Sequence, residues 1–170
     1  MNRAFSIAAA LLAAMLLQVA VAPHIAIAGV APNFLLLVVI ALALLDGPRA
    51  GTASGFAAGL AFDLLGSGPI GPAALVLCVV GWVAGSLQAN MFAEGWRLPV
   101  TVAFLTSLVA EVSYAIVLAV LGAGSPLLAA FTGVMLPAAV YNGMLALFLF
   151  PVLARFLRRE RRVTTFSRIG

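Results

Sequence analysis

Two acidic side chains interrupt long apolar stretches of this chain, and they are the strongest candidates for chemistry. Asp63 and Glu111 lie among aliphatic residues, where a charged group is costly in hydrocarbon and marks a function or a partner. Together they could form a proton relay, but neither stretch contains Lys, Arg or His to extend one. Asp63 lies near the expected outer end of its helix, where we expect water to reach it. We therefore favour a carboxylate that is protonated or hydrogen-bonded to loop amides or a partner helix.

The sequence contains no set of residues suited to nucleophilic catalysis or to metal binding. His24 is the only histidine, and the expected topology places it at the outer end of the first helix. Ser54 lies near the inner end of the third helix, so roughly 20 Å separates the two side chains at 1.5 Å per residue. A serine nucleophile needs its base within hydrogen-bonding distance. Cys78 is the single cysteine. We therefore expect no enzyme activity, no cofactor and no metal site.

A ladder of small residues leads to the first of these acids. Gly51, Gly55 and Gly59 recur every fourth residue, so a helix places them on one face, where a neighbouring backbone can approach closely. Asp63 follows four residues later. We favour packing within the molecule for this face, with contact to a partner protein as the alternative, and we expect residues 51–72 to form the centre of the fold.

Other small and polar residues are candidates for contacts between helices. The predicted fourth helix carries its own pair of glycines, Gly81 and Gly85. Asn142 is the best candidate for a specific polar contact, because its amide needs several hydrogen-bonding partners in hydrocarbon.

The composition is that of an integral membrane protein. Of 170 residues, 65% are hydrophobic and 8% are charged, whereas globular proteins average about 45–50% apolar and 25% charged residues. The net charge of +4 comes from arginine, since the chain has no lysine. In a soluble protein this charge would suggest nucleic acid, but in a membrane protein a basic tail facing an anionic leaflet explains it. We expect a lipid bilayer and no nucleic acid as partners.

The apolar runs predict an all-α protein with about six transmembrane helices in one bundle. The first run follows a basic start and could be a signal peptide, but it exceeds the usual apolar length of 7–15 residues. The second run is short unless residues from about Ile25 contribute. Pro137 divides the last run into an interfacial segment, 127–135, and a final span. The predicted spans are 4–22, 33–45, 51–65, 73–89, 98–121 and 137–157.

The distribution of arginine predicts the orientation of these spans. With the N-terminus in the cytoplasm, Arg3, Arg49, Arg97 and all arginines of the tail lie inside. The predicted outer loops, 23–32, 66–72 and 122–126, contain no charged residue. This agrees with the excess of Lys and Arg in cytoplasmic loops. We therefore predict a multi-pass domain at 1–157 and an arginine-rich cytoplasmic tail at 158–170, with both termini in the cytoplasm.

Several motifs together resemble one protein family. The stretch GFAAGLAFDLLGSGPIG at 55–71, with PNFLLL at 32–37 and GPRAG at 47–51, resembles the core signature of the rod shape-determining protein MreD family. The motif LPAAVYN at 136–142 and FPVL at 150–153 are similar to the last helix of that family. The resemblance covers nearly the whole chain in the right order. One position departs from it, because Asn33 stands where the family often has Asp.

The resemblance implies a non-enzymatic inner-membrane subunit of the bacterial cell elongation machinery. Such subunits work with the bitopic protein MreC, the actin-like MreB, and the RodA glycosyltransferase with its class B penicillin-binding protein, and they support lateral peptidoglycan synthesis. The resemblance also implies a fold similar to the membrane substrate-binding subunit of energy-coupling-factor vitamin transporters. A subunit of such a transporter is the alternative function. Such subunits dock on their energising partner through small residues four positions apart, and Ala9 and Ala13 have this spacing. The predicted outer loops, however, lack polar groups that could bind a vitamin.

Overall fold

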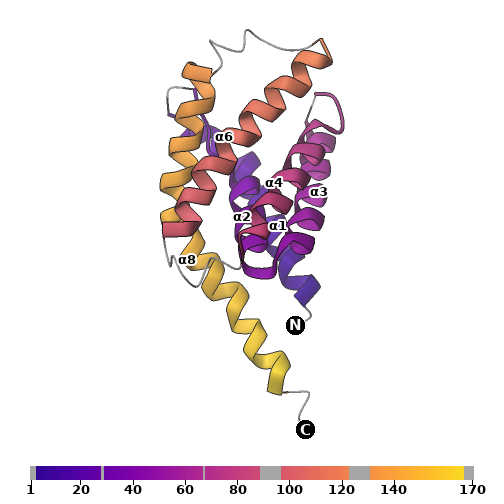
Figure 1. Ribbon diagram of the computed structural model, residues 1–170, viewed down its shortest axis with the longest axis vertical. Helices are drawn as coiled ribbons and strands as arrows, with labels where there is room; N and C mark the ends of the chain where they lie inside the picture. The colour runs from indigo at the N-terminus through magenta and orange to yellow at the C-terminus, as the bar shows by residue number, and fades with distance from the viewer. Residues whose placement is uncertain (1–2, 28, 67, 89–96, 123–130, 167–170) are drawn as a thin grey trace.

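The protein is an all-helical bundle (Figure 1). The computed structural model describes residues 3–27, 29–66, 68–88, 97–122 and 131–166. Consecutive helices of the bundle run in opposite directions. The six α-helices in the described part of the chain are α1 (Arg3–Ala20), α2 (Phe34–Asp46), α3 (Pro48–Leu65), α4 (Pro72–Ser86), α6 (Arg97–Val120) and α8 (Leu136–Phe166).

Three segments of the described chain are long and apolar enough to cross a membrane. They are Arg3–Ala20, Pro99–Val120 and Phe131–Phe156. The apolar helices α2 and α4 are shorter, with 13 and 15 residues. At 1.5 Å per residue, α2 is about 20 Å long, less than the hydrocarbon core of about 30 Å. The protein is thus a helical membrane protein in which helices of different lengths pack together.

Helix α2 lies at the centre of the bundle. It packs against α1, α3, α4, α6 and α8, and every residue from Phe34 to Leu45 is buried. Its sequence is apolar on all sides, which is typical of a helix surrounded by other helices. The expectation that residues 51–72 form the centre is wrong, because α3 lies at the side of the bundle and exposes Phe56 and Leu64.

The segment before α2 does not lengthen this helix, which keeps the short length predicted for residues 33–45. Residues Ala22–Ile25 form a short 3-10 helix, η1. Ile27 and Val30 then exchange backbone hydrogen bonds of 3.0 and 2.9 Å in an isolated antiparallel bridge. The helix starts at Phe34 because Asn33 is its N-cap and stops the helix from extending backwards.

The final helix α8 begins at Leu136, so Pro137 lies in its first turn as predicted, but the residues directly before it are not a separate segment. A π-helical turn, η3 (Phe131–Met135), leads directly into α8. Proline is tolerated in the first turn of an α-helix, where its missing N–H group would have no intrahelical partner. Single π-helical turns commonly adjoin α-helices. The beginning of the predicted interfacial segment, 127–130, lies outside the described residues.

Helix α8 continues beyond the other helices of the bundle (Figure 1). The predicted domain boundary at residue 157 falls inside this helix, which extends to Phe166. The N-terminal end of α1 and the C-terminal end of α8 lie at the same end of the molecule. Most of the segment between the fourth and fifth predicted spans, residues 89–96, lies outside the described residues.

Candidate functional site

Asp63 is buried and accepts hydrogen bonds from the beginning of α4. Its exposed fraction is 5%, so the expectation that water reaches it is wrong. The N–H groups of Gly71 and Ala74 donate to its Oδ2 at 2.9 and 3.1 Å. The N–H group of Ala73 donates to its Oδ1 at 3.2 Å. The carboxylate near the end of one helix therefore caps the start of the next.

Helix α4 needs a cap of this kind. The first N–H groups of an α-helix have no intrahelical partners, and a side chain at the N-cap position usually accepts one of them. The N-cap of α4 is Gly71, whose φ angle is +120° and which has no side chain. A carboxylate at a helix N-terminus is also stabilised by the helix dipole. Asp63 on α3 therefore supplies the acceptor oxygens that Gly71, without a side chain, cannot provide.

The glycines of α3 lie against the backbone of α4. A Cβ atom added to Gly51 would come within 3.0 Å of the carbonyl of Gly81, and one added to Gly55 would come as close to the carbonyl of Leu77. At Gly59 the obstructing backbone is that of Ala73. Real Cβ atoms essentially never approach so closely. The glycine faces of the two helices thus meet, and each glycine allows the backbones to touch.

Polar side chains from two other helices satisfy the N-terminus of α2. The N–H group of Asn33 donates to Oδ1 of Asn142 on α8 at 2.8 Å. The N–H group of Phe34 donates to Oε1 of Gln18 on α1 at 2.7 Å. Oδ1 of Asn33 itself accepts the N–H group of Leu36 at 2.9 Å. Asparagine at position 33 therefore keeps the capping oxygen that an aspartate would provide.

Gln18 was not predicted from the sequence. It is the only amide side chain in the first apolar run, and a single amide among aliphatic residues was the signal that could have identified it. The amide nitrogen of Asn142 is buried and has no hydrogen-bonding partner in the described part of the chain. Asn142 thus contributes an acceptor to α2, while its donor remains unused there.

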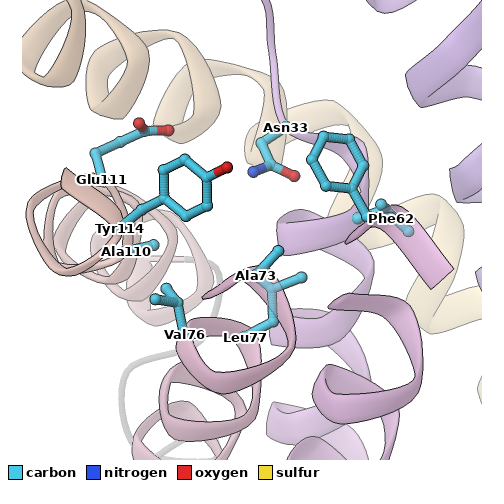
Figure 2. A pocket seen from close by; sticks show the side chains of 9 residues that line it. Asn33, Phe62, Ala73, Val76, Leu77, Ala110, Glu111 and Tyr114 are labelled. Carbon is cyan, nitrogen blue, oxygen red and sulfur yellow. The ribbon is translucent and has the colours of Figure 1, made fainter. Parts of the chain in front are cut away.

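Glu111 lies beside a pocket of about 260 Å³. Figure 2 shows Glu111 and Tyr114 on α6 facing Asn33 at the start of α2. Phe62 lines the pocket, whereas the neighbouring Asp63 does not. The two predicted acids therefore have different surroundings, and the structure shows no hydrogen bond between them in the described residues.

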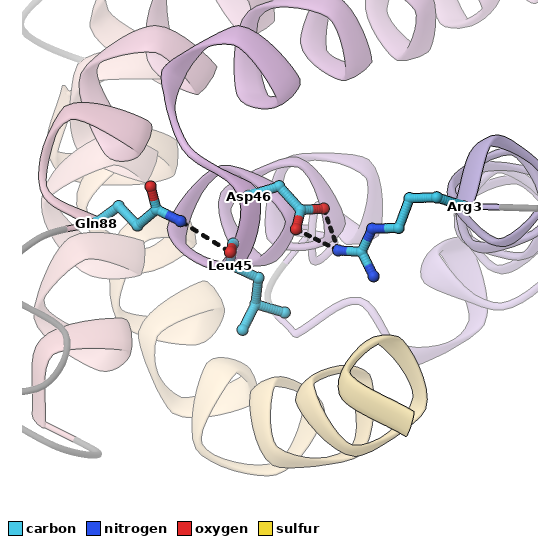
Figure 3. A network of polar contacts seen from close by, with 4 residues as sticks. All are labelled: Arg3, Leu45, Asp46 and Gln88. Atoms are coloured by element: carbon cyan, nitrogen blue, oxygen red, sulfur yellow. Dashed lines mark hydrogen bonds and ion pairs between the residues drawn. The ribbon is translucent and has the colours of Figure 1, made fainter. Parts of the chain in front are cut away.

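At the opposite end of α2, polar side chains join three parts of the chain (Figure 3). Arg3 at the start of α1 forms an ion pair with Asp46, the last residue of α2. Gln88, just after α4, donates to the carbonyl of Leu45 at 2.8 Å. Both ends of the central helix are therefore tied to its neighbours by side-chain hydrogen bonds.

These features are structural, and the described residues contain no group of three or more His, Cys, Asp or Glu side chains that could hold a metal ion. Comparison with known proteins gives one match. A family model described as rod shape-determining protein MreD matches residues 1–160. No curated protein and no solved structure matches the chain. Because the match covers nearly the whole of the 170-residue chain, the chain belongs to the MreD family of rod shape-determining membrane proteins.

Proposed function

We propose that this protein is a non-enzymatic inner-membrane subunit of the bacterial cell elongation complex. In this role it supports cell shape and lateral peptidoglycan synthesis through MreC and through RodA with its class B penicillin-binding protein, and it works alongside MreB. The observation that carries the proposal is the family match over residues 1–160.

The use of the polar groups supports a scaffold rather than an enzyme. The Asp63 carboxylate is occupied by three backbone N–H groups of the α4 N-terminus. The acceptor oxygens of Asn142 and Gln18 are occupied by N–H groups of α2. Groups engaged in this way fix the relative positions of helices. A fixed bundle of this kind would present a constant surface to partner proteins in the membrane.

We also propose a six-span arrangement with both termini in the cytoplasm. The alternating directions of the six described α-helices and the common location of the two chain ends support it (Figure 1). The positions of Arg3, Arg49 and Arg97 support the orientation, because they follow the rule that arginine concentrates on the cytoplasmic side. The similarity of the fold to the membrane subunit of energy-coupling-factor transporters stays a prediction.

The position of the α3 glycines favours packing within the molecule over contact with a partner protein. Gly51, Gly55 and Gly59 are covered by α4, so a partner protein would have to separate the two helices to reach them. We therefore propose that these glycines, with Asp63, act in packing within the molecule. Contacts with MreC would then use other surfaces of the bundle.

Co-purification tests the proposed function. The chain, carrying an affinity tag, is expressed in rod-shaped bacteria, extracted in mild detergent and recovered. We expect MreC and RodA to be enriched at least tenfold over a control preparation from an unrelated multi-pass protein with the same tag. Recovery of a tightly retained vitamin in place of MreC and RodA would contradict the proposal and favour the transporter alternative.

A further inference from the structure

The pocket beside Glu111 has the construction of a small ligand site. Its volume is about 260 Å³, close to the lower limit of the range of about 300–1,000 Å³ typical of ligand pockets. Four helices form its walls, because it is lined from α2, α3, α4 and α6. Phe62, Val76 and Leu77 provide an apolar wall. The pocket can therefore hold a small molecule with an apolar body.

Polar groups gather on one side of this pocket. Glu111 and Tyr114 are three residues apart on α6, so both project from the same face of that helix. Figure 2 shows the Tyr114 ring reaching toward the side chain of Asn33, with Glu111 next to it. Neither Glu111 nor Tyr114 forms a side-chain hydrogen bond with another residue in the described part of the chain. Their hydrogen-bonding capacity remains available to a ligand.

The charge of the lining determines which ligand fits. Among the described residues that line the pocket, Glu111 is the only charged one and none is basic. An anionic group would lie next to the Glu111 carboxylate without a compensating charge, which is unfavourable in apolar surroundings. A cation placed against this carboxylate would stabilise its charged form and be stabilised by it. The Tyr114 hydroxyl can accept a further hydrogen bond from the same group.

We propose that this pocket binds a small amphiphile whose primary ammonium group contacts Glu111 and whose apolar body contacts Phe62, Val76 and Leu77. The ammonium group could come from a lipid headgroup or from a free amine, since both present the same chemistry. This binding activity goes beyond the scaffold function and does not depend on it, because it follows from the geometry of the pocket.

Calorimetric titration of three matched probes tests this proposal. The full chain in lipid nanodiscs is titrated with octylamine, octanol and octanoate, and empty nanodiscs are titrated to subtract partitioning into lipid. We expect saturable binding of octylamine at least tenfold tighter than binding of octanol, and no saturable binding of octanoate. Equal affinities for the three probes, or no saturable octylamine binding, would overturn the proposal.

Two variants locate the site. Glu111→Gln keeps the shape of the side chain and should weaken octylamine binding at least tenfold, which corresponds to about 1.4 kcal/mol, while octanol affinity changes less than twofold. Glu160→Gln removes the same charge elsewhere in the sequence, in the C-terminal part of α8, and should leave all three affinities unchanged. Unchanged octylamine affinity in Glu111→Gln would contradict the role of this carboxylate.

A pocket-filling variant gives an independent readout if loss of the acid disturbs folding. Val76→Trp should abolish saturable binding of octylamine and octanol while the helical circular dichroism remains that of the unmodified chain. Retained octylamine binding in this variant would place the amine elsewhere and overturn the proposal.

To separate lipid headgroups from free amines, the octylamine titration is repeated in nanodiscs with and without ethanolamine phospholipid. Weaker octylamine binding in the nanodiscs that contain this lipid identifies the lipid headgroup as the source of the ammonium group. Equal octylamine binding in the two kinds of nanodisc identifies a free amine.

Discussion

Asp63 shows how a single buried acid can join two helices of a membrane protein. Its carboxylate lies near the end of α3 and accepts three N–H groups around the start of α4. A buried N–H group without a partner costs about 1–3 kcal/mol, so three of them near apolar surroundings would strongly destabilise the turn between the helices. The acid therefore has a structural reason to be there.

Replacing Asp63 with Ala should lower the free energy of unfolding by about 3 kcal/mol, because the N–H groups of Gly71, Ala73 and Ala74 lose their acceptor. Thermal unfolding of the purified protein in detergent, followed by circular dichroism, measures the effect. Asp63→Asn is the matched variant. It keeps one acceptor oxygen in a side chain of the same shape and should lose about half as much. An Ala variant as stable as the unmodified chain would contradict the capping role.

At the scale of elements, the closest packing in the described bundle joins α3 and α4. The antiparallel pair brings glycine opposite glycine at Gly51 and Gly81, and it brings Gly85 against Pro48. Without a hydrophobic driving force between helices in lipid, such close approach is the main source of van der Waals attraction. The two helices therefore form one unit on the side of the bundle.

Gly55→Ala should separate α3 from α4. The added methyl group would meet the backbone carbonyl of Leu77, which cannot rotate away as a side chain can. Overpacking of this kind costs about 1–3 kcal/mol, and we expect a loss near the upper limit in a thermal unfolding experiment. Gly133→Ala is the matched control, because a Cβ atom there meets nothing within 4 Å. Equal stability of the two variants would show that the glycine contact is unimportant.

Helix α2 is the element around which the others pack. Side chains of α1 and α8 satisfy its N-terminal N–H groups, and the ion pair of Asp46 with Arg3 holds its C-terminal end. A short helix buried on all sides cannot rely on lipid or water to satisfy its ends. Its neighbours must supply those hydrogen bonds, and this requirement explains Gln18 near the end of α1 and Asn142 within α8.

At the scale of the whole molecule, the distribution of charge agrees with the arrangement of the helices. The end of the bundle that carries Arg3 and Asp46 is also the end from which α8 extends. The opposite end carries the turn between α3 and α4, whose described residues after Asp63 are uncharged. The molecule is therefore polarised along its long axis, as expected for a protein oriented by arginine in the membrane.

Single-cysteine labelling of intact cells should confirm this orientation. With Cys78 replaced by Ala, a cysteine at Ile70, whose exposed fraction is 65%, should react with a membrane-impermeant maleimide added outside. A cysteine at Thr164 in the tail should react only after the membrane is permeabilised, because the proposed orientation places the arginine-rich tail in the cytoplasm. Labelling of the tail in intact cells would contradict the six-span arrangement.

The sequence alone determined the class of the protein and its family. Composition and the lengths of the apolar runs identify a helical membrane protein, and the motif around Asp63 identified a resemblance that the family match confirmed. These properties are accessible because they depend on residues close together in the chain. Five predicted helix positions agree with described α-helices to within about three residues, since a long apolar run admits few alternatives to a helix.

The tertiary structure decided which helix is central and what the polar groups contact. The hydrogen bond between Asn33 and Asn142 joins residues 109 positions apart, and the pocket beside Glu111 is lined from four helices. The burial of Asp63 likewise depends on how the turn folds back onto α3. No local pattern in the sequence encodes these contacts, because they form only when the helices pack together. Apolar surfaces pack with little directional preference, so an apolar run does not specify which helices will be its neighbours.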